Sequence, residues 1–445
     1  MPHLRLPALL IFTLVAVTGC GAQSPSDTPK NVILFIADGC GPASFTMARD
    51  YLRYKGTATA LALDSIQTGS VRTHASDSRV TDSAASATAY ACGVKTYNGA
   101  IAVNDDLESI PTILEGAEAK GMVTGLVATS RITHATPASF SAHVPRRSME
   151  AEIAAQQIRQ GIEVLLGGGL NFYADEAGGG RRDDGRNIMN EAADLGYSVV
   201  TDRAGFDAAD ATPLLGLFSG SHMDYETDRD AAEQPSLAEM TIKAIELLND
   251  ESDEGFFLMV EASRIDHAGH ANDLVAHLHD ILAFNDAIAQ ALAFAADDGE
   301  TLVVSTSDHE TGGMTLGRNI NGRGIYAWHP EAIENTQGSY DQFQRTEGAD
   351  PAAYFGLTDL NEDELADIAA ADGWDQHAVL GEIISRRSLV AWTTNGHTGV
   401  DVGLYAYGPG RDHFFGNVDN THIGLALAKV MGLDLSTITP KDGME

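Results

Sequence analysis

The feature that most constrains the fold is a series of apolar, β-branched runs that alternate with helix-like segments. Several runs are continuously apolar, as expected for strands that are covered on both faces. Helical patterns lie between them, most clearly at residues 237–248 and 274–292. The alternation predicts an α/β fold, a three-layer, doubly wound, mostly parallel sheet with helices on both faces. The predicted strands are residues 32–37, 123–128, 164–166, 197–200, 256–260, 301–305 and 402–407.

The alternation stops between residues 315 and 390. This segment carries Trp328, Pro330, Pro351, acidic runs and two predicted short helices. We interpret it as a loop-rich insertion beside the sheet edge, suited to a lid or an oligomer contact. Because no low-complexity linker divides the rest of the chain, residues 31–440 are predicted to form a single domain.

The N-terminus has the pattern of an export signal. His3 and Arg5 precede an apolar run at residues 6–17, which is too short for a comfortable membrane-spanning helix. Residues 1–19 are therefore predicted to be a signal peptide. The four residues that end at Cys20 resemble a bacterial lipobox, which implies cleavage before Cys20, lipidation of that cysteine and a flexible tether over residues 20–30. The alternative is plain secretion with an incidental cysteine.

These segments predict a protein of the cell envelope. It would be exported, face the periplasm or the cell exterior, and contact the membrane through its lipid anchor only. The chain has 28 Lys and Arg against 63 Asp and Glu, a formal net charge of −35. This balance argues against nucleic-acid binding through a basic face. If the substrate is an anion, the site needs a local positive field, which bound metal cations can provide.

Candidate metal ligands follow four of the predicted strands. Ligands of open α/β sheets bind beyond the carboxyl ends of the strands, so these side chains are expected to converge. An Asp-x-x-x-His spacing at Asp266 and His270 would place both side chains on one face of a helical turn. Asp, Glu and His without Cys suit Zn²⁺, and a set of oxygen ligands suits Mg²⁺. The candidates are Asp38, His134, Thr136, Glu261, Asp266, His270, Asp308 and His309, with His397 shortly before the last predicted strand.

Ser83 follows Asp82 and precedes a run of very small residues that extends to Tyr90. Such a run suits a closely packed helix whose first turn is open to a bulky group. A helix N-terminus offers free N–H groups and favours an anion or an ionised nucleophile. The alternative is an ordinary N-cap on a helix of the core.

Taken together, seven motifs resemble those of the alkaline phosphatase family. They occur in the family's order and span roughly residues 30–430. The resemblance implies that the protein hydrolyses phosphate monoesters, releasing inorganic phosphate and an alcohol. It also allows a homodimer, because the family is usually dimeric. The motifs lie at residues 35–39, 80–89, 93–96, 135–137, 260–267, 307–309 and 396–399.

The resemblance also implies a site with two zinc ions and one magnesium ion. Ser83 would attack phosphorus and form a phosphoserine, which is then hydrolysed, and Arg147 would bind the phosphate. Arg146 is the adjacent alternative to Arg147, and Asp82 would position Arg147 or its loop. The implied ligands are Asp266, His270 and His397 for the first zinc, Asp38, Asp308, His309 and Ser83 for the second, and Asp38, Thr136 and Glu261 for magnesium, with His134 bound directly or through water.

Two other readings remain at this point. A phosphodiesterase of the same superfamily would share the two-metal core, but its branches generally lack the residues of the third site that Thr136 and Glu261 supply here. A lipid-anchored protein that only binds metal or phosphate would need no serine nucleophile beside the metals.

Overall fold

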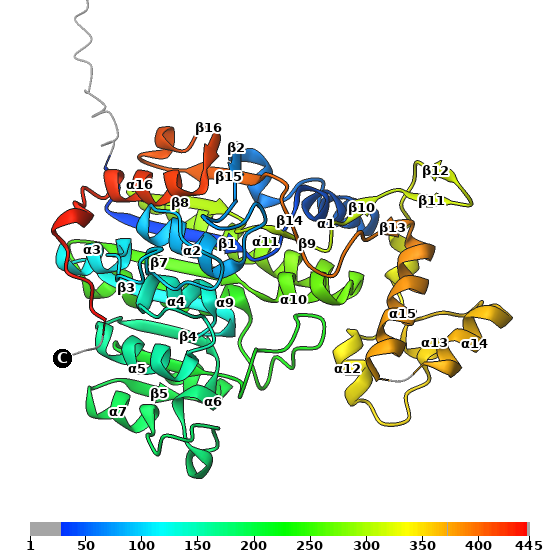
Figure 1. Cartoon of the computed structure of the whole chain (residues 1–445), viewed down its shortest axis with the longest axis horizontal. Coiled ribbons are helices and arrows are strands. Elements are labelled where there is room, and N and C mark those ends of the chain that lie inside the picture. The colour runs from blue at the N-terminus through cyan, green and yellow to red at the C-terminus, as the bar shows by residue number, and fades with distance from the viewer. Residues whose placement is uncertain (1–27, 372, 443–445) are drawn as a thin grey trace, which may run out of the picture.

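The computed structural model describes residues 28–371 and 373–442, apart from the side chains of residues 373 and 374. The predicted signal peptide and Cys20 lie outside the described residues. The structure is built on a ten-stranded sheet (Figure 1). Its strands lie in the order β16 (Gly416–Asp419), β2 (Gln67–Arg72), β15 (Val402–Tyr407), β8 (Thr301–Thr306), β1 (Asn31–Ala37), β7 (Phe256–Ala262), β3 (Val123–Arg131), β4 (Val164–Gly168), β6 (Leu214–Leu217) and β5 (Ser198–Val200).

The sheet is largely parallel. β15 is antiparallel to both of its neighbours, β8 and β2, while β16 is parallel to β2. The pairs from β8 through β1, β7, β3, β4 and β6 to β5 are all parallel. Within this sheet, β15 therefore runs against all the other strands. The predicted fold class is confirmed.

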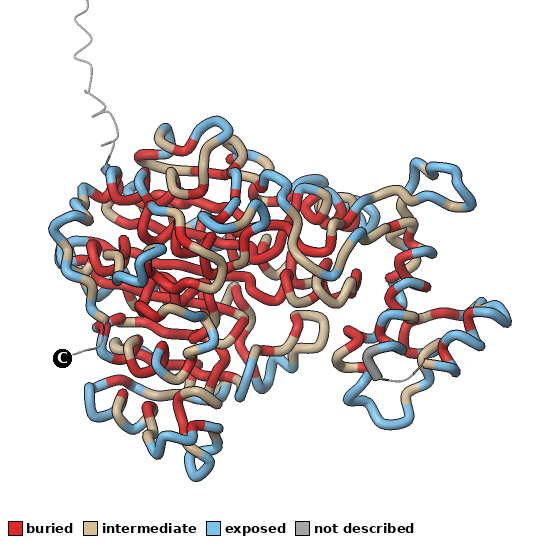
Figure 2. The backbone as a smooth tube through the Cα atoms, in the orientation of Figure 1, coloured by how far each residue is buried: buried red, intermediate tan, exposed pale blue. Residues whose placement is uncertain are grey.

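Side chains of β1 alternate between two hydrophobic cores, which gives the fold its three layers. Ile33 and Phe35 belong to one core, and Val32, Leu34 and Ile36 to the other. The first core is covered by α1 (Pro42–Lys55), α9 (Leu237–Glu251) and α11 (Leu274–Asp298). The second is covered by α3 (Ile113–Ala119), α5 (Glu150–Gln160), α7 (Ile188–Asp194) and α16 (Asn420–Val430). Buried residues follow the central strands in Figure 2.

All seven predicted strands exist, and the predicted helices at 237–248 and 274–292 are α9 and α11. The chain has three further strands in this sheet that the sequence did not indicate. β2 and β16 lie at one edge, and their mixed sequences QTGSVR and GNVD lack an apolar pattern because both strands are largely accessible to solvent. β6 is fully buried but has only four residues, too few to show a period.

The segment 315–390 projects from the side of the sheet (Figure 1). It is more helical than we expected, since α15 alone covers Gly373–Ser388. Its remaining α-helices and strands are β10 (Thr315–Leu316), β11 (Arg318–Ile320), β12 (Arg323–Ile325), α12 (Tyr340–Arg345), α13 (Pro351–Tyr354), α14 (Glu362–Ala370) and β13 (Val390–Ala391). β10 and β13 pair where the segment leaves and rejoins the body.

The projecting segment is joined to the body by buried contacts at the start of α12. The backbone N–H of Tyr340 donates to Asp273 Oδ2 at 2.8 Å, and that of Ser339 donates to Asp228 Oδ1 at 2.8 Å. Tyr340 and Phe343 pack into the same core as Phe35. None of the described helices is both long and apolar enough to cross a membrane.

Candidate active site

The candidate site lies at the carboxyl ends of the central strands. Asp38 directly follows β1, Asp308 follows β8, and Glu261 is the penultimate residue of β7. Because these three strands are adjacent and parallel, their ends meet at one edge of the sheet. All three carboxyl side chains are buried. The fold thus brings together residues that are separated by more than two hundred positions in the chain.

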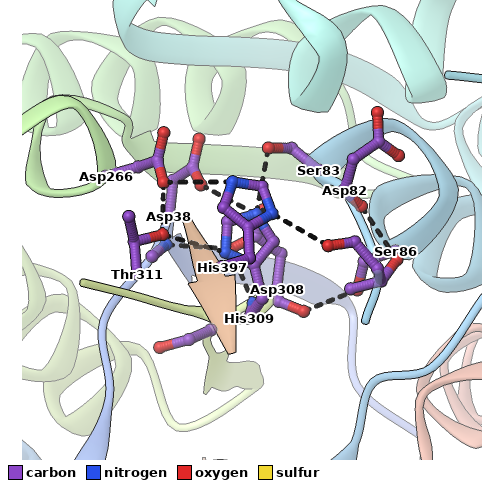
Figure 3. A network of polar contacts seen from close by, with 12 residues as sticks. Asp38, Asp82, Ser83, Ser86, Asp266, Asp308, His309, Thr311 and His397 are labelled. Carbon is purple, nitrogen blue, oxygen red and sulfur yellow. Dashed lines mark hydrogen bonds and ion pairs between the residues drawn. The ribbon is translucent and has the colours of Figure 1, made fainter. Parts of the chain in front are cut away.

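Ser83 is the first residue of α2 (Ser83–Cys92), a helix buried along its whole length. Asp82 is its N-cap, and the Asp82 side chain accepts a hydrogen bond from the Ala85 N–H at 3.0 Å. Ser83 Oγ lies 3.2 Å from His309 Nε2 (Figure 3). The helix-cap reading of this stretch is therefore correct, and the cap also holds the serine hydroxyl against the imidazole of a candidate metal ligand.

Potential metal ligands converge into three overlapping clusters. Within each cluster the ligand atoms lie within 4.8 Å of one another. Asp38 and His309 each belong to two clusters, so the clusters form one continuous centre. They consist of Asp266, His309 and His397, of Asp38, Asp308 and His309, and of Asp38, His134 and Glu261.

His270 joins the first cluster from α10 (Arg264–Ala271). Its Nε2 lies 3.4 Å from Asp266 Oδ2, as the helical spacing predicts, and 3.2 Å from His397 Nε2. The rings of His397 and His309 are stacked, with centroids 3.6 Å apart (Figure 3). The structure thus places all three residues expected for the first zinc side by side.

The buried polar atoms of this centre fit cations. Several of them have no hydrogen-bond partner among the described residues, although an unpaired buried polar group costs about 1–3 kcal/mol. All of them except Thr136 Oγ1 belong to residues of the three clusters, and bound cations would satisfy them. These atoms are Asp38 Oδ1 and Oδ2, His134 Nδ1, Thr136 Oγ1, Glu261 Oε1 and Asp308 Oδ2.

The crowding of the carboxyl groups leads to the same conclusion. Burial, followed by the charges of Asp308, Asp266 and Glu261, raises the pKa of Asp38 well above its ordinary value. Burial raises the pKa of Asp308 to about 6 and that of Glu261 to about 7. Three carboxylates cannot all ionise here at neutral pH without compensation, and divalent cations would provide it.

Arg147 is the guanidinium of the site. Its Nη1 donates to Asp82 Oδ2 at 3.1 Å, and its Nη2 lies 2.9 Å from His134 Nε2. Arg146 is exposed to solvent. Of the two adjacent arginines, Arg147 is therefore the one that lies beside Ser83 and the ligand clusters.

Several groups that orient the candidate ligands were not identified from the sequence. His397 Nδ1 lies 2.8 Å from the backbone carbonyl of Thr81, and His270 Nδ1 lies 2.5 Å from that of Asn395. The hydroxyl of Thr311 donates to Asp266 Oδ1. Backbone carbonyls leave no signal in a sequence. For Thr311 the one available signal was its position in the sequence, two residues after His309.

A group of histidine and arginine side chains packs together beside His134, an arrangement that the sequence did not indicate. The His222 ring lies 4.2 Å from the His267 ring and 5.4 Å from the His134 ring, measured between centroids. Arg131 Nη1 contacts His222 Nε2, and Arg264 Nη1 lies 3.0 Å from His267 Nδ1. Arg131 ends β3, His222 follows β6, and Arg264 and His267 belong to α10, so segments far apart in the chain meet beside His134. Burial lowers the pKa of all three histidines, so the positive charge here comes from the two arginines.

The chain matches the family model described as alkaline phosphatase over residues 29–433. It belongs to the alkaline phosphatase family. Alkaline phosphatase 3 of Bacillus subtilis is 40% identical over 428 residues, which cover 91% of this chain and 89% of the relative. The repressible alkaline phosphatase of Saccharomyces cerevisiae is 37% identical over 489 residues, which cover 97% of this chain and 86% of the relative.

Solved alkaline phosphatases share the fold. The enzyme of Thermus thermophilus superposes with a TM-score of 0.83 and 31% identity, covering 96% of each chain. The cold-active enzyme of Shewanella sp. superposes with a TM-score of 0.82 and 33% identity, covering 90% of this chain and 99% of that one. Family membership makes this chain a metal-binding hydrolase of phosphate monoesters, as the sequence motifs indicated.

Proposed function

We propose that this alkaline phosphatase hydrolyses phosphate monoesters through a covalent phosphoserine at Ser83. One observation carries the proposal: Ser83 Oγ lies 3.2 Å from His309 Nε2, at the edge of the three ligand clusters. A hydroxyl held at a helix N-terminus beside cation ligands is placed to react as an oxyanion. A protein that only bound metal or phosphate would not need a hydroxyl at this position.

The proposed cofactors are two zinc ions and one magnesium ion. The donor types support this division, because the first cluster is rich in imidazole and the third in oxygen. When bound, such ions stabilise the negative charge on the attacking and leaving oxygens of an in-line displacement. We assign Asp266, His270 and His397 to the first zinc, Asp38, Asp308, His309 and Ser83 to the second, and Asp38, Thr136, Glu261 and His134 to magnesium.

A structural relative has a magnesium ion at a third site. The structure is that of a variant of the alkaline phosphatase from the Antarctic bacterium TAB5, in which a histidine is replaced by glutamate, with Mg bound in the M3 site. It is 31% identical, with a TM-score of 0.68, and the match covers 92% of this chain and 99% of that one. In this chain His134 Nδ1 is buried without a described partner and belongs to the cluster of Asp38 and Glu261. We therefore propose that His134 binds the third metal directly.

The roles of the protein groups follow from their positions. Arg147 would hold two oxygens of the phosphate in a bidentate contact, and Asp82 would orient Arg147. In the first step the Ser83 Oγ–P bond forms while the bond from phosphorus to the alcohol oxygen breaks. In the second step water attacks phosphorus, the Oγ–P bond breaks, and inorganic phosphate leaves.

The alternative, a phosphodiesterase of the same superfamily, is not favoured. Thr136 and Glu261, the residues expected for the third site, are both buried, and Thr136 Oγ1 and Glu261 Oε1 have no hydrogen-bond partner among the described residues. Glu261 also belongs to a ligand cluster with Asp38. A monoester dianion also carries one more charge than a diester, which suits the additional cation site.

The export and domain assignments stay predictions. We propose a signal peptide at residues 1–19, lipidation of Cys20, a tether over residues 20–30, and one catalytic domain over residues 31–440 that contains the insertion 315–390. The mature protein would face the periplasm or the cell exterior. Mass spectrometry of its N-terminus should find an acylated Cys20, and an unmodified N-terminus further along the chain would contradict the anchor.

Ser83→Ala tests the catalytic proposal. With zinc and magnesium present, turnover of 4-nitrophenyl phosphate should fall by about a thousandfold or more. Ser86→Ala is the matched control, because it removes a hydroxyl one turn along the same helix, which donates to the Asp308 carbonyl at 2.8 Å. It should retain activity within about tenfold. Acid quenching during wild-type turnover should trap phosphate on Ser83. Turnover of the Ser83 variant close to the wild-type rate would refute the mechanism.

A further inference from the structure

A cavity of about 620 Å³ adjoins the candidate site. Its walls come from two parts of the fold, the loops around α10 and the projecting segment with α15 (Figure 1). The body contributes His270, Asn272 and Asn395, and the segment and its return to the body contribute Arg318, Glu382 and Trp392. This volume is within the range of small-molecule sites, and no role has been assigned to it above.

His270 connects the cavity to the reacting centre. Its side chain is 41% exposed, whereas that of Asp266 beside it is only 5% exposed. His270 is therefore the member of the first cluster that faces the cavity. In Figure 3, Ser83 and Asp266 approach the stacked His309 and His397 rings from different sides. An in-line attack by Ser83 expels the alcohol on the side opposite Ser83, which is the side of Asp266 and His270.

Trp392 gives the cavity a rigid aromatic wall. Its Nε1 donates to Ser385 Oγ on α15 at 3.1 Å, and its ring lies 5.5 Å from the His277 ring in an edge-to-face arrangement. The opposite edge packs against Gly312, where an added Cβ would come within 2.4 Å of Trp392 Cε3. An indole held on several sides loses little entropy when a flat ring stacks on it.

The charges of the cavity disfavour an additional anion. Arg318 is the single Lys or Arg among its described wall residues, and it is already paired with Glu382 and with the Val390 carbonyl. Asp375 adds a second carboxylate to the wall. A second phosphate or a carboxylate on the substrate would find no free cation there and would be repelled.

We propose that this cavity is the subsite for the alcohol part of the substrate, and that it selects alcohols which carry an aromatic ring and no second anionic group. The ring stacks on Trp392, while Asn395 Nδ2, which donates to the His270 carbonyl at 2.9 Å, holds the cavity floor in place beside His270. The proposal rests on the proposed function, because it takes the position of the leaving alcohol from attack by Ser83.

Three substrates that differ only in the alcohol test the subsite: ethyl phosphate, 2-phenylethyl phosphate and 2-(4-carboxyphenyl)ethyl phosphate. All three are alkyl esters, so the leaving oxygen is chemically similar in each. The wild-type enzyme should prefer 2-phenylethyl phosphate over both others in kcat/KM. Trp392→Ala should lower kcat/KM for 2-phenylethyl phosphate by about tenfold and for ethyl phosphate by less than about twofold.

Two further variants keep the test decisive. Trp328→Ala, a control, removes a partly buried tryptophan of the same projecting segment that does not line the cavity, and it should leave the substrate preference unchanged. Asp375→Asn changes an exposed residue and should raise kcat/KM for the carboxylate substrate about threefold. The inhibition constant of inorganic phosphate, which has no alcohol part, should be the same in wild type and both cavity variants.

Equal losses for ethyl and 2-phenylethyl phosphate in Trp392→Ala, or a wild-type enzyme without preference between them, would overturn the subsite. Either result leaves the phosphatase activity itself in place. Failure of the proposed function would look different, because the Ser83→Ala variant would then remain active on every substrate.

Discussion

The Asp82 carboxylate joins Arg147 to the first turn of α2, which carries Ser83, the proposed nucleophile. Its Oδ2 accepts from Arg147 Nη1 at 3.1 Å, while its Oδ1 caps α2 at the Ala85 N–H and also accepts from the Gly99 N–H at 3.1 Å. Ser83 is the next residue. Because all three interactions use the same carboxylate, the position of the guanidinium is fixed relative to the first turn of the helix that carries Ser83.

Replacing this carboxylate should weaken phosphate binding. In Asp82→Asn the amide oxygen can still cap α2, but the charge on Arg147 loses its partner and its orientation. We expect KM and the inhibition constant of inorganic phosphate to rise about tenfold, with the melting temperature within a few degrees of wild type. Asp82→Ala should show the same kinetic change and additionally lose about 1 kcal/mol of stability with the cap. Unchanged phosphate inhibition in both variants would contradict the role of Asp82.

Removing the metals should destabilise the protein in a way that depends on pH. Burial raises the pKa of Asp308 to about 6 and that of Glu261 to about 7. As the pH rises from the ordinary pKa of a carboxyl group to these raised values, the metal-free folded protein therefore loses stability relative to the unfolded chain. Bound cations reverse this penalty. The difference in melting temperature between the metal-loaded and the chelated protein should therefore be larger at pH 8 than at pH 5. Calorimetry after chelation, and again after zinc and magnesium are restored, measures the two melting temperatures. A difference between them that does not depend on pH would contradict metal binding by these carboxyl groups.

A buried ion pair outside the site gives a separate pH prediction. Burial lowers the pKa of His143, but the hydrogen bond at 3.0 Å and the charge of Glu115 outweigh this effect and raise it. Because the folded-state pKa is raised, this stabilisation is complete below about pH 6.5 and is lost as pH rises through the folded value.

Glu115→Gln isolates this contribution. The glutamine can still accept from the Thr112 N–H, the contact that closes the capping box of α3. It has no negative charge, however, to stabilise the protonated imidazole of His143. Wild type should exceed Glu115→Gln in melting temperature by more at pH 6 than at pH 9. A difference that is constant, or larger at pH 9, would show that His143 is neutral in the folded protein.

The parts of the fold that the sequence predicted are those with a strong local pattern. The buried parallel strands are continuous apolar runs, and Asp266 and His270 have the spacing of one helical turn. The missed strands β2 and β16 have no such pattern, since they are the last two strands at one edge of the sheet and carry polar, partly exposed side chains.

The sequence could predict those residues of the site that come directly after a predicted strand. The supporting contacts of the site could not be predicted, because they depend on which loops meet in space. The Thr81 carbonyl reaches His397, 316 positions away, and Trp392 reaches the cavity only through the return of the projecting segment. The aromatic wall beside His270 is for this reason visible only in the three-dimensional arrangement.

Gly39 determines how closely the loop after β1 approaches α10. It adopts φ +73°, its N–H donates to Asp308 Oδ1 at 3.0 Å, and a Cβ there would come within 2.7 Å of Asp266 Cα. Gly39→Ala therefore combines backbone strain with a collision against backbone that carries a ligand. We expect a loss of about 3 kcal/mol in urea unfolding and a reduced zinc content. Gly56→Ala is the matched control, with φ +68° and open space around the added methyl group, and should lose only about 1 kcal/mol and keep its zinc. If both variants lose the same stability and bind zinc equally, the contact between the Asp38 loop and α10 does not limit the assembly of the metal centre.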